Sequence, residues 1–238
     1  MNIYAIADLH LSLNSNKPMD IYGGQWIDHL KRVKKKWNNL IGNDDVIIIV
    51  GDTSWALKFE DAIEDLTWIS LLPGKKILIK GNHDLWWTSV SKLNQLFDNM
   101  YFLQNTYYRA GKYAICGTRG WICPGDLEFT SHDQKIYQRE LGRLRLSLEA
   151  AKKAGETHII GAIHYPPANE KFEDSGFTAL FEEYGVKLVV YGHLHGMEGH
   201  LKGVQGYRNG VEYRLVSCDY LSCCPLRLTS DQIEGDEV

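Results

Sequence analysis

The chain has 238 residues, of which 44% are hydrophobic and 24% charged, with a formal net charge of -4. This length and apolar content suffice for a large buried core, and the small negative charge excludes bulk electrostatic attraction to nucleic acid or an anionic membrane. No apolar run approaches the roughly 18 residues that a membrane-spanning helix needs. We therefore expect a globular protein with no membrane partner. Because no linker-like stretch interrupts the sequence, residues 1–238 are predicted to form a single domain.

The beginning of the chain and its cysteines predict a cytoplasmic protein. Asp8 and His10 stand where a signal peptide would need an apolar region, so no signal peptide is predicted. The five cysteines are an odd-numbered set without a Cys-x-x-Cys pair. We interpret them as reduced thiols that pack in the interior, with Cys223 and Cys224 alternating across a strand.

Five segments share one pattern, in which a short apolar run without polar alternation ends in Asp, Asn or His. Runs of this kind are typical of strands that are buried on both faces of a sheet. The segments are residues 1–10, 44–52, 75–84, 157–164 and 186–195. We therefore predict five buried strands that each finish in polar side chains.

The intervening segments predict helices. Apolar residues recur at steps of three and four over residues 25–41, 58–72 and 133–155, and a shorter helix is predicted over 175–185. Strands that alternate with helices indicate βαβ units and a largely parallel sheet. Residues 101–121 and 210–228 instead read as strand, turn, strand, which predicts antiparallel strands or a second sheet. The acidic residues 230–238 are predicted to fray.

The polar ends of the five strands predict a metal centre. In an open α/β sheet, ligands bind outside the carboxyl ends of the strands, so parallel neighbours would bring these ends to one rim. The residues concerned are Asp8, His10, Asp52, Asn82, His83, His164, His193 and His195. Two carboxylates, an amide and five imidazoles pack poorly together without a cation. Two divalent metals would satisfy them, with Asp52 able to bridge both.

Each element of this pattern is weak by itself. Asp-x-His occurs by chance, a single histidine in an apolar setting is more often a hydrogen-bonded core residue, and Gly-Asn-His-Asp could form a turn. The interpretation depends on the conjunction of all five elements, each placed directly after an apolar run.

The motif series as a whole resembles the calcineurin-like metallophosphoesterase superfamily. Its pattern D-x-H, G-D, G-N-H-[ED], H and G-H-x-H appears here in order, from Asp8 to His195. The resemblance implies an α/β fold, a four-layer αββα sandwich of two mixed β-sheets flanked by helices. It also implies the ligand sets: Asp8, His10 and His195 for one metal, Asn82, His164 and His193 for the other, and Asp52 for both. His83 is left unligated beside the substrate as the catalytic residue.

The implied activity is that of a dinuclear-metal phosphohydrolase acting on small phosphomonoesters or phosphodiesters. Two metals about 4 Å apart clamp a phosphoryl group and lower the pKa of a water, which gives a hydroxide for attack on phosphorus. His83 would stabilise developing charge or protonate the leaving oxygen. Manganese, iron, zinc and nickel all stay open, because mixed nitrogen and oxygen sites accept several metals. The sequence leaves the oligomeric state open.

The sequence departs from one branch of that superfamily. Phosphoprotein phosphatases extend the second block to G-D-x-V-D-R-G, whereas residues 51–57 read GDTSWAL. The Asp and Arg that support phosphate binding in those enzymes are absent, so a phosphoprotein phosphatase is not predicted.

Further residues near the predicted rim are candidates for substrate binding. Trp55, Trp86 and Tyr165 come shortly after ligand motifs and could form a stacking platform, with packing at the sandwich edge as the alternative interpretation. Arg119 is the candidate phosphate contact, with a surface salt bridge as the alternative.

Two competing functions remain open. A cyclic-nucleotide or nucleic-acid phosphodiesterase is the nearer, although a nucleic-acid partner is not favoured unless a basic groove is present. A non-catalytic scaffold of the same fold is disfavoured because all eight motif positions are present.

Overall fold

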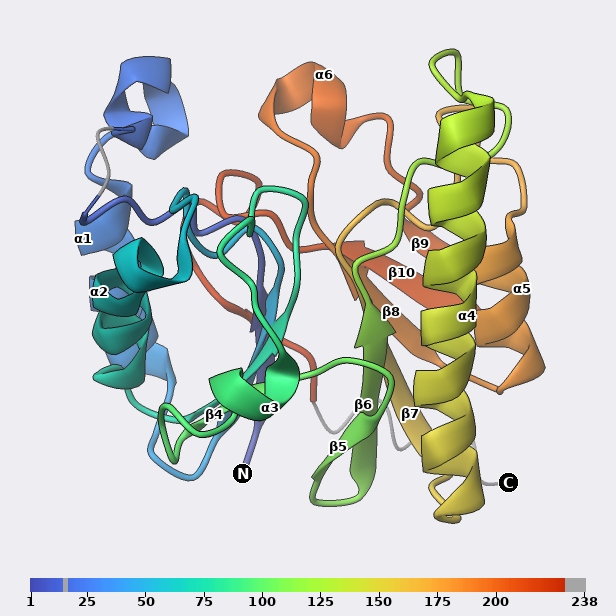
Figure 1. The fold of residues 1–238 in the computed structure, drawn as a ribbon, viewed down its shortest axis with the longest axis horizontal. Coiled ribbons are helices and arrows are strands. Elements are labelled where there is room, and N and C mark those ends of the chain that lie inside the picture. The colour runs from blue at the N-terminus through green and yellow to red at the C-terminus, as the bar shows by residue number, and fades with distance from the viewer. Residues whose placement is uncertain (15–16, 230–238) are drawn as a thin grey trace.

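The computed structural model describes residues 1–14 and 17–229, and within them two β-sheets pack face to face between helices (Figure 1). Helices α1 (His29–Leu40) and α2 (Phe59–Ser70) cover one side, while α4 (Ser131–Lys153) and α5 (Gly176–Glu183) cover the other. The predicted four-layer α/β sandwich of two mixed sheets is confirmed. Residues 230–238, which were expected to fray, lie outside the described residues.

Each sheet has a parallel centre, with an antiparallel strand at one edge of the five-stranded sheet and at both edges of the six-stranded sheet. The five-stranded sheet has the order β11 (Leu226–Arg227), β1 (Ile3–Ile6), β2 (Val46–Val50), β3 (Lys75–Ile79), β4 (Met100–Phe102). The six-stranded sheet has the order β5 (Tyr107–Ala110), β6 (Tyr113–Thr118), β7 (His158–Ile163), β8 (Leu188–Tyr191), β10 (Val211–Leu215), β9 (Gly206–Arg208). The five polar-ended strands are therefore not all neighbours, because β1, β2 and β3 belong to one sheet and β7 and β8 to the other.

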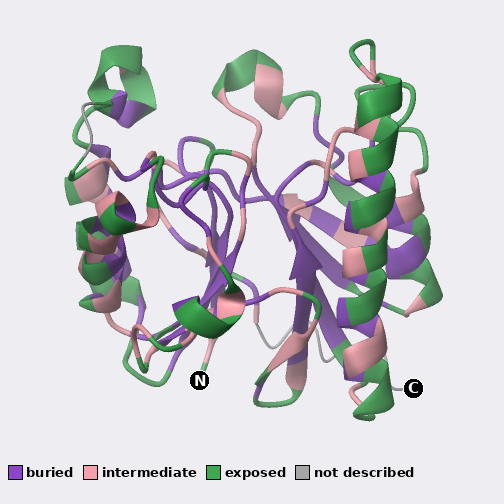
Figure 2. Cartoon of the chain, in the orientation of Figure 1, coloured by how far each residue is buried: buried purple, intermediate pink, exposed green. Residues whose placement is uncertain are grey.

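The strands of the five-stranded sheet lack polar alternation because both of their faces are buried. Successive side chains point to opposite faces of a strand, so Ile47 packs with Trp37 and Leu66 of the covering helices. Ile48 packs between the sheets with Ile160 of β7. Figure 2 shows the same distribution, with buried sheets and helices that expose their outer faces. Two-sided burial thus produces the continuous apolar runs.

Helices α4 and α5 begin at side-chain caps. Thr130 forms a capping box with Asp133 at the start of α4, and Ser175 caps α5 with its hydroxyl. The remaining short helical segments are η1 (Met19–Tyr22), η2 (Gly24–Trp26), α3 (Val90–Leu93) and α6 (Gly196–His200). In the described part of the chain, no helix is both long and apolar enough to cross a membrane.

The helix predicted over residues 25–41 begins later than expected, at His29. Gly23 and Gly24 both have positive φ, and Asp28 adopts a left-handed conformation with φ 52°. Its backbone N–H donates to the Asp20 carboxylate at 2.8 Å, and a short polar side chain tolerates this conformation better than most. Trp26 is consequently not part of the apolar face of α1.

The prediction of a strand, turn, strand unit over 210–228 is only partly right. Its two strands, β10 and β11, lie in different sheets, and the antiparallel partner of β10 is β9. Cys223 lies in the intervening turn with φ 64°, so the predicted alternation of Cys223 and Cys224 across a strand is wrong. The prediction of packed free thiols is confirmed, since all five cysteines are unpaired and four are buried.

The two sheets are joined at one end by backbone hydrogen bonds. The Ala7 N–H donates to the Val216 carbonyl at 2.8 Å, and the Cys218 N–H donates to the Ala7 carbonyl at 3.0 Å. Ala7 directly follows β1 of one sheet, and Val216 and Cys218 lie within three residues of the end of β10 in the other. The join therefore fixes the carboxyl ends of strands from both sheets beside each other.

Buried Lys76 gives a test of this packing that is independent of function. It lies in β3 and donates from Nζ to the carbonyls of Ser70 and Leu72, at the end of α2. Burial lowers its pKa from 10.5 to about 8, so the unfolded chain binds more protons between these pH values. We expect the free energy of unfolding, relative to a Lys76→Met variant, to rise with pH across this window by at most about 3 kcal/mol.

Urea denaturation of both proteins at pH 7.5 and at about pH 9.5 measures this difference. An identical pH dependence in the two proteins would contradict the lowered pKa of Lys76.

Candidate metal centre and active site

The polar strand ends gather at the joined edge of the two sheets. Asp8 and His10 follow β1, Asp52 follows β2, and Asn82 and His83 follow β3. From the second sheet, His164 follows β7, and His193 and His195 follow β8. The structure thus brings together residues from two sheets, whereas the sequence pattern indicated neighbouring strands of one.

Two groups of these side chains could each hold a metal ion. Asp8, His10 and His195 offer ligand atoms that all lie within 4.8 Å of one another, and so do Asp52, His164 and His193. In the first group, the Nε2 atoms of His10 and His195 are 3.4 Å apart. The two groups match the two ligand sets that the motif resemblance implied, apart from Asn82.

Asn82 and Asp52 complete the arrangement. The Asn82 Oδ1 atom lies 2.8 Å from His164 Nε2 and 3.0 Å from His193 Nδ1, which places it in the second group. The Asp52 Oδ2 atom lies 3.5 Å from His164 Nε2 and 3.9 Å from His10 Nε2. A single carboxylate oxygen therefore lies between residues of both groups, as a bridging ligand requires.

The backbone is strained at four of these positions. Asp8, His10, Asp52 and His193 have φ values of 59°, 46°, 49° and 73°, a region in which residues other than glycine are uncommon. Such conformations cost of order 1–3 kcal/mol each and persist where the surrounding structure enforces them. The polar side chains are thus turned into the site at an energetic cost.

Glycine at position 81 is required by close approach. A Cβ atom there would lie 2.1 Å from both the backbone nitrogen and Oδ1 of Asp52. The glycine lets the loop after β3 approach the loop after β2, where the His83 N–H donates to Asp52 Oδ1 at 2.8 Å. This contact orients the Asp52 carboxylate between the two groups.

Burial and neighbouring charges shift the titration of the cluster. Burial raises the pKa of Asp8 to about 6 and lowers those of His10 and His193 to about 3. Burial also opposes protonation of His164, but the carboxylates of Asp52 and Asp8 outweigh it and raise the pKa of His164 to about 9. The buried carboxylates therefore draw a proton onto His164.

The donor set fits divalent metals. A divalent cation would supply the positive charge that the buried carboxylates otherwise obtain from a protonated imidazole. Neutral imidazoles, carboxylates and an amide oxygen suit several transition metals. Second contacts hold the imidazoles in place, as is usual for metal-ligating histidines: His164 Nδ1 lies 2.9 Å from the Val50 carbonyl, and His195 Nδ1 lies 3.1 Å from Asp219 Oδ1.

The sequence prediction missed Asp219 and Trp26. Asp219 accepts a hydrogen bond from the Gly196 N–H and contacts both His195 and His200. It lies four residues after β10, whose sequence VEYRL alternates apolar and polar residues, so the pattern of the other five strands did not identify it. The Trp26 ring centroid lies 5.4 Å from that of His195, a contact that its assignment to a helix concealed.

The three aromatic residues that were predicted to bind substrate lie in different environments. The Trp55 ring stacks on His10 with centroids 4.5 Å apart and lies 4.3 Å from the His83 ring. Trp86 is buried away from the cavity, and its Nε1 donates to Asp84 at 3.0 Å. Tyr165 is also buried, with its ring 4.1 Å from that of His193.

Arg119 is not among the described residues that line the cavity. Its guanidinium lies 3.2 Å from Glu140 and over the ring of Trp121. Asp84, for which the sequence left a structural role open, accepts hydrogen bonds from the backbone of Thr53, Ser54 and Gly81. It therefore ties together the loops that carry Asp52 and His83.

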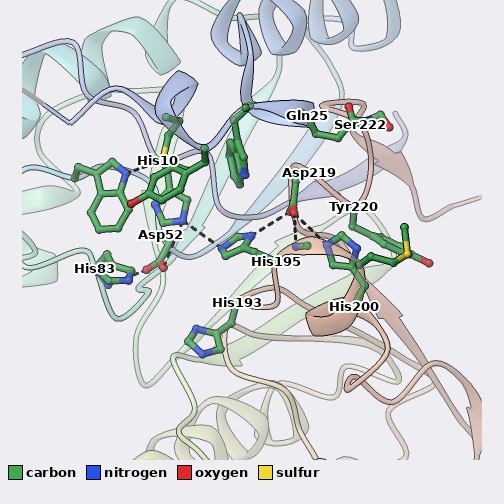
Figure 3. Close-up of a pocket in the computed structure, with 18 residues that line it drawn as sticks. His10, Gln25, Asp52, His83, His193, His195, His200, Asp219, Tyr220 and Ser222 are labelled. Atoms are coloured by element: carbon green, nitrogen blue, oxygen red, sulfur yellow. Dashed lines mark hydrogen bonds and ion pairs between the residues drawn. The ribbon is translucent and has the colours of Figure 1, made fainter.

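A cavity of about 850 Å³ opens over the metal-ligand groups. Figure 3 shows His10, Asp52 and His83 on one side of it, His200 and Tyr220 on the other, and His195 between them. His83 is exposed, yet partial desolvation of its ring lowers its pKa, an effect that the carboxylate of Asp52 partly offsets. The cavity combines clustered metal donors, a nearby imidazole that belongs to neither group, and room for an organic ligand.

Comparison with known proteins agrees with this geometry. Residues 1–197 match the family described as calcineurin-like phosphoesterase, and the chain belongs to this family. Membership assigns the chain to the metal-dependent phosphoesterases, a class of hydrolases.

The individual proteins that resemble this chain do so over a short segment or at low sequence identity. The gene 66 protein of Mycobacterium phage L5 is 34% identical over 83 residues, a match that spans 35% of this chain and 40% of that protein. Phosphopantetheinyl hydrolase from Mycobacterium tuberculosis aligns over 97% of both chains with a TM-score of 0.56 and 14% identity. TT1561 of Thermus thermophilus aligns over 81% of both chains with a TM-score of 0.54 and 14% identity. These two structures share the fold.

Proposed function

We propose that this protein hydrolyses small phosphomonoesters or phosphodiesters at a dinuclear metal centre. The observation that carries the proposal is the position of Asp52 Oδ2 between two groups of metal donors, with the His83 ring beside them. Asp8, His10 and His195 would hold one cation, and Asn82, His164 and His193 the other. When bound, the cations would stabilise charge on the phosphoryl oxygens and lower the pKa of a water.

The protein's own residues supply orientation and proton transfer. Asp219 and the Val50 carbonyl hold the rings of His195 and His164, so that the nitrogen atoms facing the centre keep their direction. His83 is proposed to deliver a proton or a hydrogen bond to the oxygen of the leaving alcohol. The Trp55 ring packs against His83 and limits where that alcohol can lie.

The proposal also concerns the extent and the location of the protein. Because both sheets contribute ligands, we treat residues 1–238 as one functional domain. The five free thiols support a reducing compartment, and we place the protein in the cytoplasm.

The substrate class is tested by comparing small esters with phosphoproteins. We expect turnover of bis(p-nitrophenyl) phosphate or p-nitrophenyl phosphate with Mn²⁺, and little activity on phosphoserine or phosphothreonine proteins. The residues that follow Asp52 lack the additional Asp and Arg, and Trp55 occupies part of the cavity wall. The ratio kcat/KM measures this discrimination.

A phosphoprotein preferred by tenfold or more, about 1.4 kcal/mol in transition-state binding, would contradict the proposed substrate class. Arg119 would then need to leave Glu140 to replace the missing arginine.

A further inference from the structure

The cavity extends well beyond the metal donors. Its volume of about 850 Å³ lies within the range of roughly 300–1,000 Å³ that accommodates drug-sized ligands. The remaining wall comes from two places: Tyr22 and Gln25 of the η1–η2 segment, and Met197 of α6 with Tyr220. In Figure 1 the η1–η2 segment and α6 both rise beyond the sheets at the same edge. The space therefore continues past a phosphoryl group bound at the centre.

Aromatic rings stand on both sides of the centre. The Trp55 ring lies 4.3 Å from the His83 ring, and the Tyr220 ring lies 5.0 Å from the His200 ring. Figure 3 shows His83 and Tyr220 on opposite sides, with His195 between them. A phosphoryl group at the centre can thus carry one substituent toward each aromatic residue.

Beyond the metal-donor groups, the described wall of the cavity provides no guanidinium or ammonium group for the second charge of a monoester. Among the described residues that line it, none is Lys or Arg. Lys17 lies outside the lining, with its Nζ 5.0 Å from the centroid of the Trp55 ring, and Arg119 is paired with Glu140. A phosphomonoester carries close to two negative charges at neutral pH, and guanidinium groups are the usual partners of such a phosphate. A diester carries one charge, and its second substituent can cover apolar and aromatic surface.

We infer that the substrates of this centre are phosphodiesters, with the leaving group beside Trp55 and the retained group beside Tyr220; this rests on the proposed function. The leaving group belongs on the Trp55 side because the imidazole of His83, which can donate a hydrogen bond to the leaving oxygen, is on that side. Hydrolysis breaks the bond between phosphorus and the leaving oxygen and forms one between phosphorus and the oxygen of water. One proton of that water ends on the leaving alcohol, and a monoester remains beside Tyr220.

Three esters with the same leaving group test this arrangement: bis(p-nitrophenyl) phosphate, methyl p-nitrophenyl phosphate and p-nitrophenyl phosphate. Their kcat/KM values are measured on the metal-loaded protein and divided by the rates of uncatalysed hydrolysis. We expect the diesters to exceed the monoester, and the aryl diester to exceed the methyl diester by about tenfold, because stacking on an aromatic side chain is favourable. In a Tyr220→Ala variant this aryl-to-methyl ratio should fall to near one.

Tyr207 provides the matched control, since it is 81% exposed in β9 and is not among the residues lining the cavity. A Tyr207→Ala variant should keep the wild-type ratio. A monoester with the highest value would overturn the inference and leave the proposed function standing. An aryl-to-methyl ratio that survives in Tyr220→Ala would overturn the placement of the retained group. Failure of protein with confirmed metal content to hydrolyse any of the three would overturn the proposed function and the inference together.

Discussion

Replacing Asp52 with asparagine is expected to deprive both metal sites of their ions. One oxygen of this carboxylate lies between His10 and His164, which belong to different donor groups. The amide keeps the size of the side chain but removes the negative charge, and it replaces one of the two carboxylate oxygens with an NH₂ group that cannot bind a cation. Elemental analysis of purified protein should show both metals reduced, and activity should fall with them.

Two further variants separate bridging from general damage. His195→Asn should deplete only the metal held with Asp8 and His10, whereas Asp44→Asn, at an exposed position, should keep both metals. Circular dichroism would establish that each variant is folded. Full occupancy of both sites in folded Asp52→Asn would show that the carboxylate is not shared.

Replacing His83 with asparagine is expected to separate chemistry from metal binding. The contact of His83 with Asp52 is made by its backbone N–H, at 2.8 Å from Asp52 Oδ1, and the substitution leaves that group in place. The imidazole belongs to neither donor group. We therefore expect both metals to stay bound while kcat falls on the order of a hundredfold or more, the range for a general acid or charge stabiliser.

A His132→Asn variant, changed at an exposed histidine of α4, serves as the control and should retain wild-type kcat. If His83→Asn lost metal together with activity, His83 would be a ligand and its proposed role would be wrong.

The sequence predicts most of the fold because buried strands and helices have characteristic patterns of apolar residues. Strands such as Val46–Val50 are buried on both faces and therefore read as unbroken apolar runs. The residue that follows such a run lies at the sheet edge, so polar side chains such as Asp52 could be assigned to a common rim before the topology was known. The expected helices α2, α4 and α5 lie close to their predicted bounds because their apolar spacing is regular.

The sequence could not predict contacts between segments that are far apart along the chain. Nothing in the apolar run of β7 distinguishes a neighbour of β3 from a member of a second sheet, because both environments bury the same side chains. Trp26 fits the helical spacing of apolar residues. The left-handed backbone conformation of Asp28, however, separates Trp26 from α1 and places its ring against His195. Asp219 became recognisable only when the end of β10 was seen beside the end of β1.

Each donor group takes residues from both sheets. This arrangement links the supply of metal to folding. Asp8 and His10 extend from β1, but His195 extends from β8; likewise Asp52 follows β2, whereas His164 follows β7. Cations held by these groups would bind the docked sheets and not the separated ones, in the manner of a reversible cross-link. By mass action, a ligand at a hundred times its Kd adds about 2.7 kcal/mol to the stability of the state that binds it. Metal scarcity would thus lower the amount of folded protein as well as the activity of each molecule.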